Sequence, residues 1–229
     1  MNKLTLRKIH RWLGLIAGIQ LLAWTVSGLY FTIIPIEEIR GNHLLTKQPE
    51  PVSVADVSLL SVSDLAKQHA TLADASLADV QLVSVLGQPV YLADNARFDA
   101  QSGAKLEPVS EAEAKAVVAE RSEAPIREVE YVEQVPVDSE YRGGELPAWR
   151  VTIAGDENAA LYVGTQTGRI RAVRTDAWRW FDLLWSLHIM DYEAREDFNH
   201  LLIQAMAGLG LVTVMSGLAL FFLTLRIRR

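Results

Sequence analysis

Two long uncharged stretches, residues 12–34 and residues 201–225, dominate the hydrophobic pattern of this chain. The first contains 23 residues. As a helix rising ~1.5 Å per residue, it is long enough to cross a hydrocarbon core of roughly 30 Å. It is longer than the apolar part of a secretory signal, and it ends in Ile33-Ile34-Pro35-Ile36 without a small-residue cleavage site. We therefore expect two transmembrane helices, the first of them a retained signal anchor.

The segment between these stretches, residues 35–200, is too long for a structureless loop. Residues 35–57 contain several prolines and are predicted to be a connector. A helix-and-strand pattern then occurs twice, over residues 58–109 and over residues 110–174. The first copy predicts a helix at 61–70, strands at 80–86 and 90–93, and a hairpin at 97–105. The second predicts a helix at 110–123, strands at 127–135, 148–153 and 160–163, and a hairpin at 164–168.

The two predicted hairpins carry the main sign of an internal repeat. Asp-Ala-Gln-Ser-Gly at residues 99–103 corresponds to Gly-Thr-Gln-Thr-Gly at residues 164–168. Turn residues between β-branched runs indicate antiparallel strands. Ser110 with Glu113 three residues later is the pattern of a capping box at the start of the second helix. Each copy is thus predicted to be a short helix with a small antiparallel sheet, an α+β arrangement.

Residues 175–200 have a different character. Trp178, Phe181, Trp185 and His188 recur at helical spacing, with Asp182 and Ser186 elsewhere on the helix. This pattern predicts an amphipathic helix on the outer membrane surface, with Trp178 and Trp185 at headgroup depth. Trp12 is the corresponding anchor at the start of the first span. A turn then leads into the second span.

The distribution of charge predicts the orientation in the membrane. All 28 acidic residues lie between Glu37 and Asp197, where 15 of the 22 Lys and Arg residues also lie, so this region has a net charge of −13. The other seven basic residues lie in residues 1–11 and 226–229. Because positive flanks stay in the cytoplasm, both termini are expected there and residues 35–200 outside. The acidic middle gives no reason to expect nucleic-acid binding, and the absence of cysteine excludes disulfides and thiolate metal sites.

Each predicted span carries a row of small residues. The rows comprise Gly14, Gly18, Thr25 and Gly28 in the first span and Gly210, Thr213 and Gly217 in the second. Helices in lipid associate through close packing at such faces. The rows predict that the two spans pack together within one chain. Homodimerisation and docking on another membrane protein are the alternatives.

Several of these segments resemble the PepSY-associated transmembrane family. The likeness lies in residues 7–15 and 24–28, in Trp-Ser-Leu-His-Ile-Met-Asp-Tyr at 185–192, and in residues 198–200 and 216–218. The 99–103 hairpin, and in part the 164–168 hairpin, are similar to those of PepSY modules. The resemblance implies a bacterial inner-membrane protein with two PepSY-like periplasmic units between its spans. Some larger members, which have more spans than the two expected here, are haem-bearing reductases of ferric siderophores, and PepSY modules elsewhere are proposed peptidase inhibitors.

Three histidines are candidate ligands for haem b, the cofactor that the resemblance implies. The axial ligands of a haem iron lie on opposite faces of the macrocycle. His10 and His200 are expected at opposite ends of a span, roughly 30 Å apart, and cannot share a haem. His188 and His200 could do so if the surface helix folds back over the second span. His10 would need a ligand from a second copy or another subunit.

Each histidine also has a structural interpretation. His10 would face lipid phosphates, His188 would anchor the surface helix, and His200 would cap the second span. The acids at 191, 193, 196 and 197 could bind a cation, but a solvated turn is expected there and no metal site is predicted. The sequence contains no HExxH or GxSxG motif and no phosphate-binding glycine loop, so no catalytic residue is predicted.

The sequence therefore favours a non-catalytic binding or scaffolding subunit of an inner-membrane system, with membrane lipid and another membrane or periplasmic protein, or a second copy, as partners. An electron-transfer subunit that holds haem during ferric-siderophore reduction is the alternative. A periplasmic peptidase modulator is the third hypothesis.

Overall fold

The computed structural model of the chain describes residues 3–225 apart from residues 50, 54, 56, 73 and 156. The chain divides into two compact units. One, here called the helical unit, consists of Met1–Pro35 and Trp180–Arg229; the other, the sheet unit, consists of Ile36–Arg179. Helix α5 (Asp176–Ile189) begins in the sheet unit and ends in the helical unit. The two units are described separately below.

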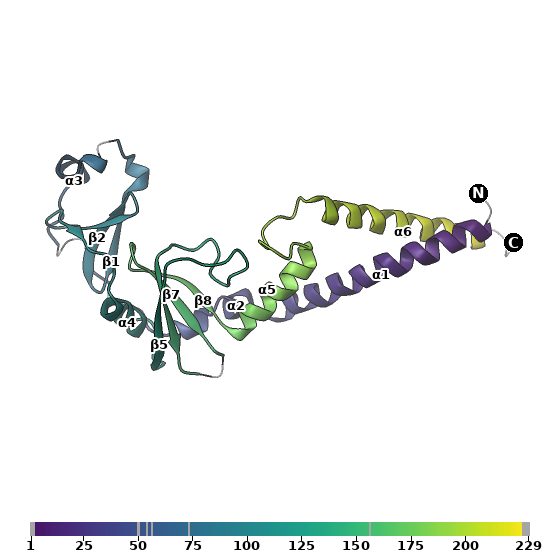
Figure 1. Cartoon of the computed structure of the whole chain (residues 1–229), viewed down its shortest axis with the longest axis horizontal. Helices are drawn as coiled ribbons and strands as arrows, with labels where there is room; N and C mark the ends of the chain where they lie inside the picture. Colours follow the sequence, from purple (N-terminus) through teal and green to yellow (C-terminus); the bar gives the residue numbers. More distant parts are fainter. Residues whose placement is uncertain are drawn as a thin grey trace. The chain divides into compact units, whose positions relative to one another are not determined.

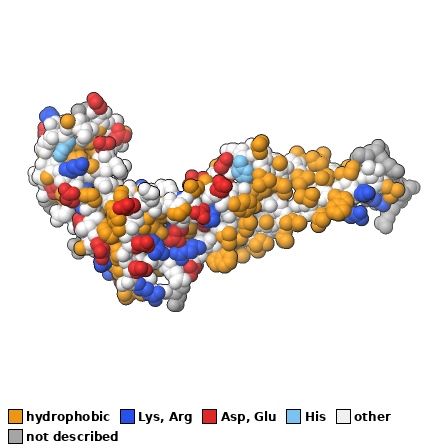
Figure 2. All heavy atoms as spheres, in the orientation of Figure 1, with side chains coloured by type: hydrophobic (Ala, Val, Ile, Leu, Met, Phe, Trp, Pro, Cys, Tyr) orange, Lys and Arg blue, Asp and Glu red, His pale blue; other side chains and the backbone are white. Residues whose placement is uncertain are grey.

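The helical unit contains α1 (Lys3–Ile33), the larger part of α5 and α6 (Leu201–Leu225) (Figure 1). Within α1 and α6, the segments Arg7–Ile33 and Leu201–Thr224 are long and apolar enough to cross a membrane. Their apolar side chains are largely exposed, as the continuous hydrophobic surface in Figure 2 shows. Both helices occur where the uncharged stretches predict them. Apolar helices of this length with exposed side chains are typical of segments that lie in lipid.

The sheet unit begins with α2 (Ile36–Ile39) and the short 3-10 helix η1 (Asn42–Leu44) and then contains two repeats of one arrangement. Each repeat is a helix followed by a four-stranded antiparallel meander, with strand orders β1-β2-β3-β4 and β5-β6-β7-β8. The first repeat has α3 (Val62–Gln68), η3 (Ala70–Leu72), η4 (Leu77–Asp79), β1 (Gln81–Val85), β2 (Gln88–Ala93), β3 (Ala96–Asp99) and β4 (Lys105–Leu106). The second has α4 (Glu111–Ala119), β5 (Ile126–Val132), β6 (Ala148–Ile153), β7 (Ala160–Gly164) and β8 (Ile170–Arg174).

Equivalent hydrogen bonds establish that the repeats correspond in detail. The Leu60 amide donates to the Ala100 carbonyl in the first repeat (2.8 Å), and the Val109 amide donates to the Thr165 carbonyl in the second (2.7 Å). The side chains of Tyr91 and Trp149 donate, each at 2.7 Å, to the carbonyls of Leu60 and Val109 respectively. These bonds join the start of α3 to the β3–β4 turn and the start of α4 to the β7–β8 turn. The internal repeat therefore includes the helices as well as the hairpins that indicate it in the sequence.

The sequence pattern and the structure differ mainly at element ends. Strand β8 follows the second hairpin, where the pattern predicts no separate strand, and α4 is shorter than the predicted helix at 110–123. The capping box at Ser110 and Glu113 is present. The largest buried cluster combines residues from both repeats, including Val85, Val118 and Leu161. The sheet unit is therefore held by one shared core in addition to a smaller cluster within the first repeat.

Candidate functional site in the helical unit

His188 lies at the end of α5 against the middle of α1. Its Nδ1 is 2.7 Å from the hydroxyl of Ser27, a fully buried residue of α1. Its ring is stacked on that of Trp185 and also contacts Phe31 and Trp24, with ring centroids 5.6–6.3 Å apart.

His10 of α1 lies against α6 in a similar way. Its Nδ1 is 2.6 Å from the hydroxyl of Ser216. The ring also lies against Gly217, where an added Cβ would come within 3.2 Å of His10 Cε1. The two histidines mark opposite ends of the helical unit. Ser27 and His10 are 17 residues apart on α1, about 25 Å along the helix axis.

The serine hydroxyls decide the tautomer of both imidazoles. Ser216 donates its single hydroxyl proton to the Thr213 carbonyl (2.8 Å), and Ser27 donates to the Ala23 carbonyl (2.8 Å). Each serine oxygen must therefore accept from the histidine Nδ1–H, which places the lone pair of a neutral imidazole on Nε2. Neither Nε2 has a hydrogen-bond partner among the residues that the structure describes. A donated Nδ1–H with an unused Nε2 is the usual arrangement of a metal-ligating histidine.

His200 is arranged differently. Its Nε2 donates to the Ile189 carbonyl at 2.9 Å, and its Nδ1 accepts from the Ile203 amide at 3.5 Å in the first turn of α6. Both ring nitrogens are thus used within the protein. His200 acts as a cap between two helix ends, and the structure offers no free nitrogen on it for a haem iron.

The acidic turn between α5 and α6 is a self-contained loop. One Asp191 carboxylate accepts from the backbone amides of Glu193, Glu196 and Asp197 at 3.0–3.2 Å. Burial acts to raise the pKa of Asp191, but these backbone hydrogen bonds outweigh it and lower the pKa. Within the described part of the chain, no group of three His, Asp or Glu side chains is arranged to hold a metal ion.

The rows of small residues have different surroundings in the helical unit. A Cβ added at Gly14, Gly18, Gly28 or Gly210 would meet nothing within 4 Å, whereas Gly217 meets His10. Thr25 and Thr213 donate to carbonyls of their own helices, at Leu21 and Leu209. Of the predicted packing residues, Gly217 alone has its Cα face against the other span. The faces of the other four glycines are open within the described part of the chain, and the role of these rows in helix packing stays a prediction.

The three predicted anchor tryptophans have separate environments. Trp12 is exposed on α1. Trp178 belongs to the sheet unit, where the guanidinium groups of Arg174 and Arg142 lie 4.1 and 5.8 Å from its ring. Trp185 is half-buried beside Phe31, and its Nε1 donates to the Arg195 carbonyl at 3.1 Å. The placement of these residues at headgroup depth stays a prediction.

Several residues that order this region escape sequence analysis. Asp182 of α5 is 4% exposed and is paired with Arg195 of the following loop. The signal in the sequence is a single acid, Asp182, in the otherwise uncharged segment 180–189. A carboxylate among apolar residues requires a partner. Ser27 and Ser216 lie in segments that resemble the family, but their pairing with His188 and His10 had no signal in the sequence.

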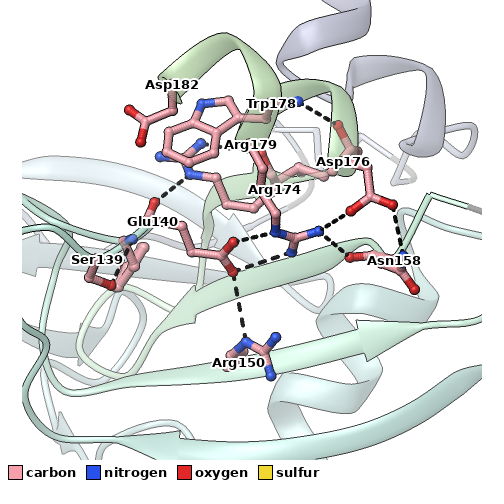
Figure 3. A network of polar contacts seen from close by, with 12 residues as sticks. Ser139, Glu140, Arg150, Asn158, Arg174, Asp176, Trp178, Arg179 and Asp182 are labelled. Carbon is pink, nitrogen blue, oxygen red and sulfur yellow. Dashed lines mark hydrogen bonds and ion pairs between the residues drawn. The ribbon is translucent and has the colours of Figure 1, made fainter. Parts of the chain in front are cut away.

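A second polar cluster lies in the sheet unit (Figure 3). Glu140 accepts from Arg179 Nε at 2.8 Å, and its carboxylate is 3.9 Å from Arg150 Nε. Asp176 accepts from Asn158 and Arg179, and these hydrogen bonds lower its pKa. The groups border an open hollow of about 620 Å³. The acids and arginines of this cluster pair with one another, so the cluster stabilises the fold.

No curated protein and no solved structure matches the chain. A match to the PepSY-associated TM region family extends over residues 7–229. It includes both candidate spans and the segment between them. The resemblance to this family is thereby confirmed. In the helical unit, Trp24 and Ser27 contact His188, and His10 contacts Ser216. The chain belongs to the PepSY-associated transmembrane family and is a membrane-associated protein.

Proposed function

We propose that this chain is an accessory subunit of a bacterial inner-membrane system, with two PepSY-like units as its periplasmic binding module. Its spans dock on the helices of another membrane protein or of a second copy. The observation that supports this function is the open glycine face of α1, at Gly14 and Gly18, which nothing within the described chain covers. Close helix contacts in lipid require such faces.

This function predicts a contact that depends on one side of α1. On a helix with 3.6 residues per turn, Ile16 lies roughly opposite the Gly14–Gly18 face and is also exposed. A photoreactive side chain at Gly18 in native membranes is expected to cross-link to protein, and the same group at Ile16 to lipid. Introducing Gly14→Leu should abolish the protein adduct at position 18 by blocking close approach. Equal lipid adducts at both positions would contradict docking through this face.

The alternative function is a haem-binding subunit of an inner-membrane electron-transfer system, such as one that reduces ferric siderophores. The donor chemistry of His188 and His10 fits haem, because each has its Nδ1–H donated to a serine and its Nε2 available. His200 does not fit. A bound haem would supply one-electron chemistry, while Ser27 and Ser216 hold the imidazoles in the ligating tautomer. Since the two histidines lie at opposite ends of the unit, each haem would need its second axial ligand from a partner chain.

A visible spectrum of the protein purified with its partners tests this alternative. We expect a Soret band that weakens at least twofold in His188→Ala or His10→Ala, because each substitution removes one ligand. His200→Ala is the matched control and should keep the band, since both of its nitrogens are used in capping. A colourless complex that takes up no added haem would eliminate the haem function while leaving the docking function intact.

A further inference from the structure

The last backbone carbonyls of α5 accept hydrogen bonds from side chains of α1 and of the residue before α6. The last carbonyls of a helix have no partners within it and normally bond to solvent. In α5 the carbonyl of Leu187 accepts from Gln20 Nε2 at 3.4 Å, that of His188 from Trp24 Nε1 at 2.5 Å, and that of Ile189 from His200 Nε2 at 2.9 Å. Three successive carbonyls are thus bonded to residues of α1 and of the start of α6.

The partners of these carbonyls lie deep along the first span. Trp24 is nine residues before the end of α1 at Ile33, about 14 Å along the axis. Contacts between Phe31 and Phe181 (centroids 4.7 Å apart) and between Ser27 and His188 show that α5 runs back along α1 from its end toward its middle. In Figure 1, α5 crosses the end of α1 that lies away from the chain termini, and the bonds of Trp24 and Ser27 to His188 bring its last turn against α1. The final turn of α5 therefore lies beside the uncharged part of α1.

In its part within the helical unit, α5 exposes apolar side chains and buries polar ones, the opposite of a helix that lies in water. Its outward face in the helical unit is formed by Trp180, Leu183 and Leu187, which are 60%, 44% and 37% exposed. Its polar residues Asp182 and Ser186 are buried, with Arg195 and the Leu183 carbonyl as partners. An interfacial helix keeps its charged residues toward water. Pairing of Asp182 and Ser186 inside the protein, together with outward apolar residues, is the arrangement that hydrocarbon favours.

We infer that α5 enters the bilayer beside α1 as a short helix that does not span it, and that the face of Trp180, Leu183 and Leu187 contacts lipid acyl chains. The exposed apolar surfaces of α1 and α6 belong to the same unit and have the same occupant, so no separate protein partner is needed to cover this face. The prediction of a helix on the membrane surface is replaced by one whose end lies within the membrane.

The chain contains no cysteine, so single cysteines with nitroxide labels can test this inference in the full chain reconstituted in lipid nanodiscs. The test sites are Leu183→Cys and Leu187→Cys. Leu211→Cys on α6 is the lipid-exposed control and Val137→Cys in the sheet unit the water-exposed control, each replacing a side chain that is 65% exposed. We expect the test sites to resemble Leu211→Cys, with collision rates with oxygen several-fold above those with a water-soluble nickel chelate.

Two results would overturn the inference. Nickel access equal to that of Val137→Cys would place α5 in water. Labels at both test sites that are shielded from oxygen and nickel alike would show that protein covers this face. Leu183 and Leu187 are 44% and 37% exposed, so each replacement removes only part of a packed side chain. Unchanged circular dichroism of each variant confirms that it is folded.

Discussion

Replacing Asp182 by alanine is expected to destabilise the helical unit by about 3 kcal/mol, because the substitution leaves the Arg195 guanidinium largely buried without its carboxylate. Part of the expected loss of stability comes from the loop that contains Arg195. Its Arg195 carbonyl accepts from Trp185 Nε1, and this bond depends on the position of Arg195. Equilibrium unfolding of the purified chain in mixed detergent micelles, followed by tryptophan fluorescence, measures the effect. Arg195→Met should cost a similar amount, because it removes the cation that lies against the buried Asp182 carboxylate.

The double substitution Asp182→Leu with Arg195→Met separates the ion pair from packing. Removal of both charges eliminates the unpaired group, so the double variant is expected to lose about 1 kcal/mol or less relative to the original chain. A loss equal to the sum of the two single variants would show that the two side chains stabilise the protein independently. That result would also weaken the placement of Asp182 in a water-poor environment.

Replacing Glu145 by alanine is expected to destabilise the sheet unit by about 3 kcal/mol. The buried Glu145 carboxylate accepts from the amides of Gln166 and Thr167 at 2.9 and 3.0 Å, and from the Thr167 hydroxyl at 2.7 Å. In the first repeat the same three bonds are made by Asp99 to Gln101 and Ser102, at 2.7–3.1 Å. Without Glu145 the part-buried donors of the second turn lose their acceptor, and an unsatisfied buried group costs ~1–3 kcal/mol. Chemical denaturation followed by far-ultraviolet circular dichroism gives the change in unfolding free energy.

The internal repeat provides a compensating change. Gly164 occupies the position of Asp99, and a Cβ at Gly164 would overlap the Glu145 carboxyl. We expect Gly164→Asp alone to destabilise, because it adds steric overlap and a second carboxylate. Combined with Glu145→Ala, the new aspartate can bond to the turn as Asp99 does, and more than half of the lost stability should return. Failure of the double variant to exceed Glu145→Ala would show that the two turns are not equivalent.

The correspondence of these turns illustrates what a local sequence pattern reveals. Asp-x-x-Ser-Gly against Gly-x-x-Thr-Gly indicates the repeat, because turn residues act on backbone amides two or three positions away. The mismatch of aspartate with glycine was also a signal that a carboxylate must come from elsewhere. It could not name Glu145, which lies 19 residues earlier in the chain and reaches the turn through the pairing of β6 with β7.

The sequence alone determined the two spans, the α+β class of the segment between them and the helix start at Ser110. Each depends on hydrophobicity or hydrogen bonding among residues near one another in the chain. The tertiary structure decided which nitrogen of each histidine is used, which glycine faces are open, and that α5 turns Asp182 inward and leucines outward. These depend on how helices are rotated about their axes when they pack, and the order of residues within one helix does not contain that rotation.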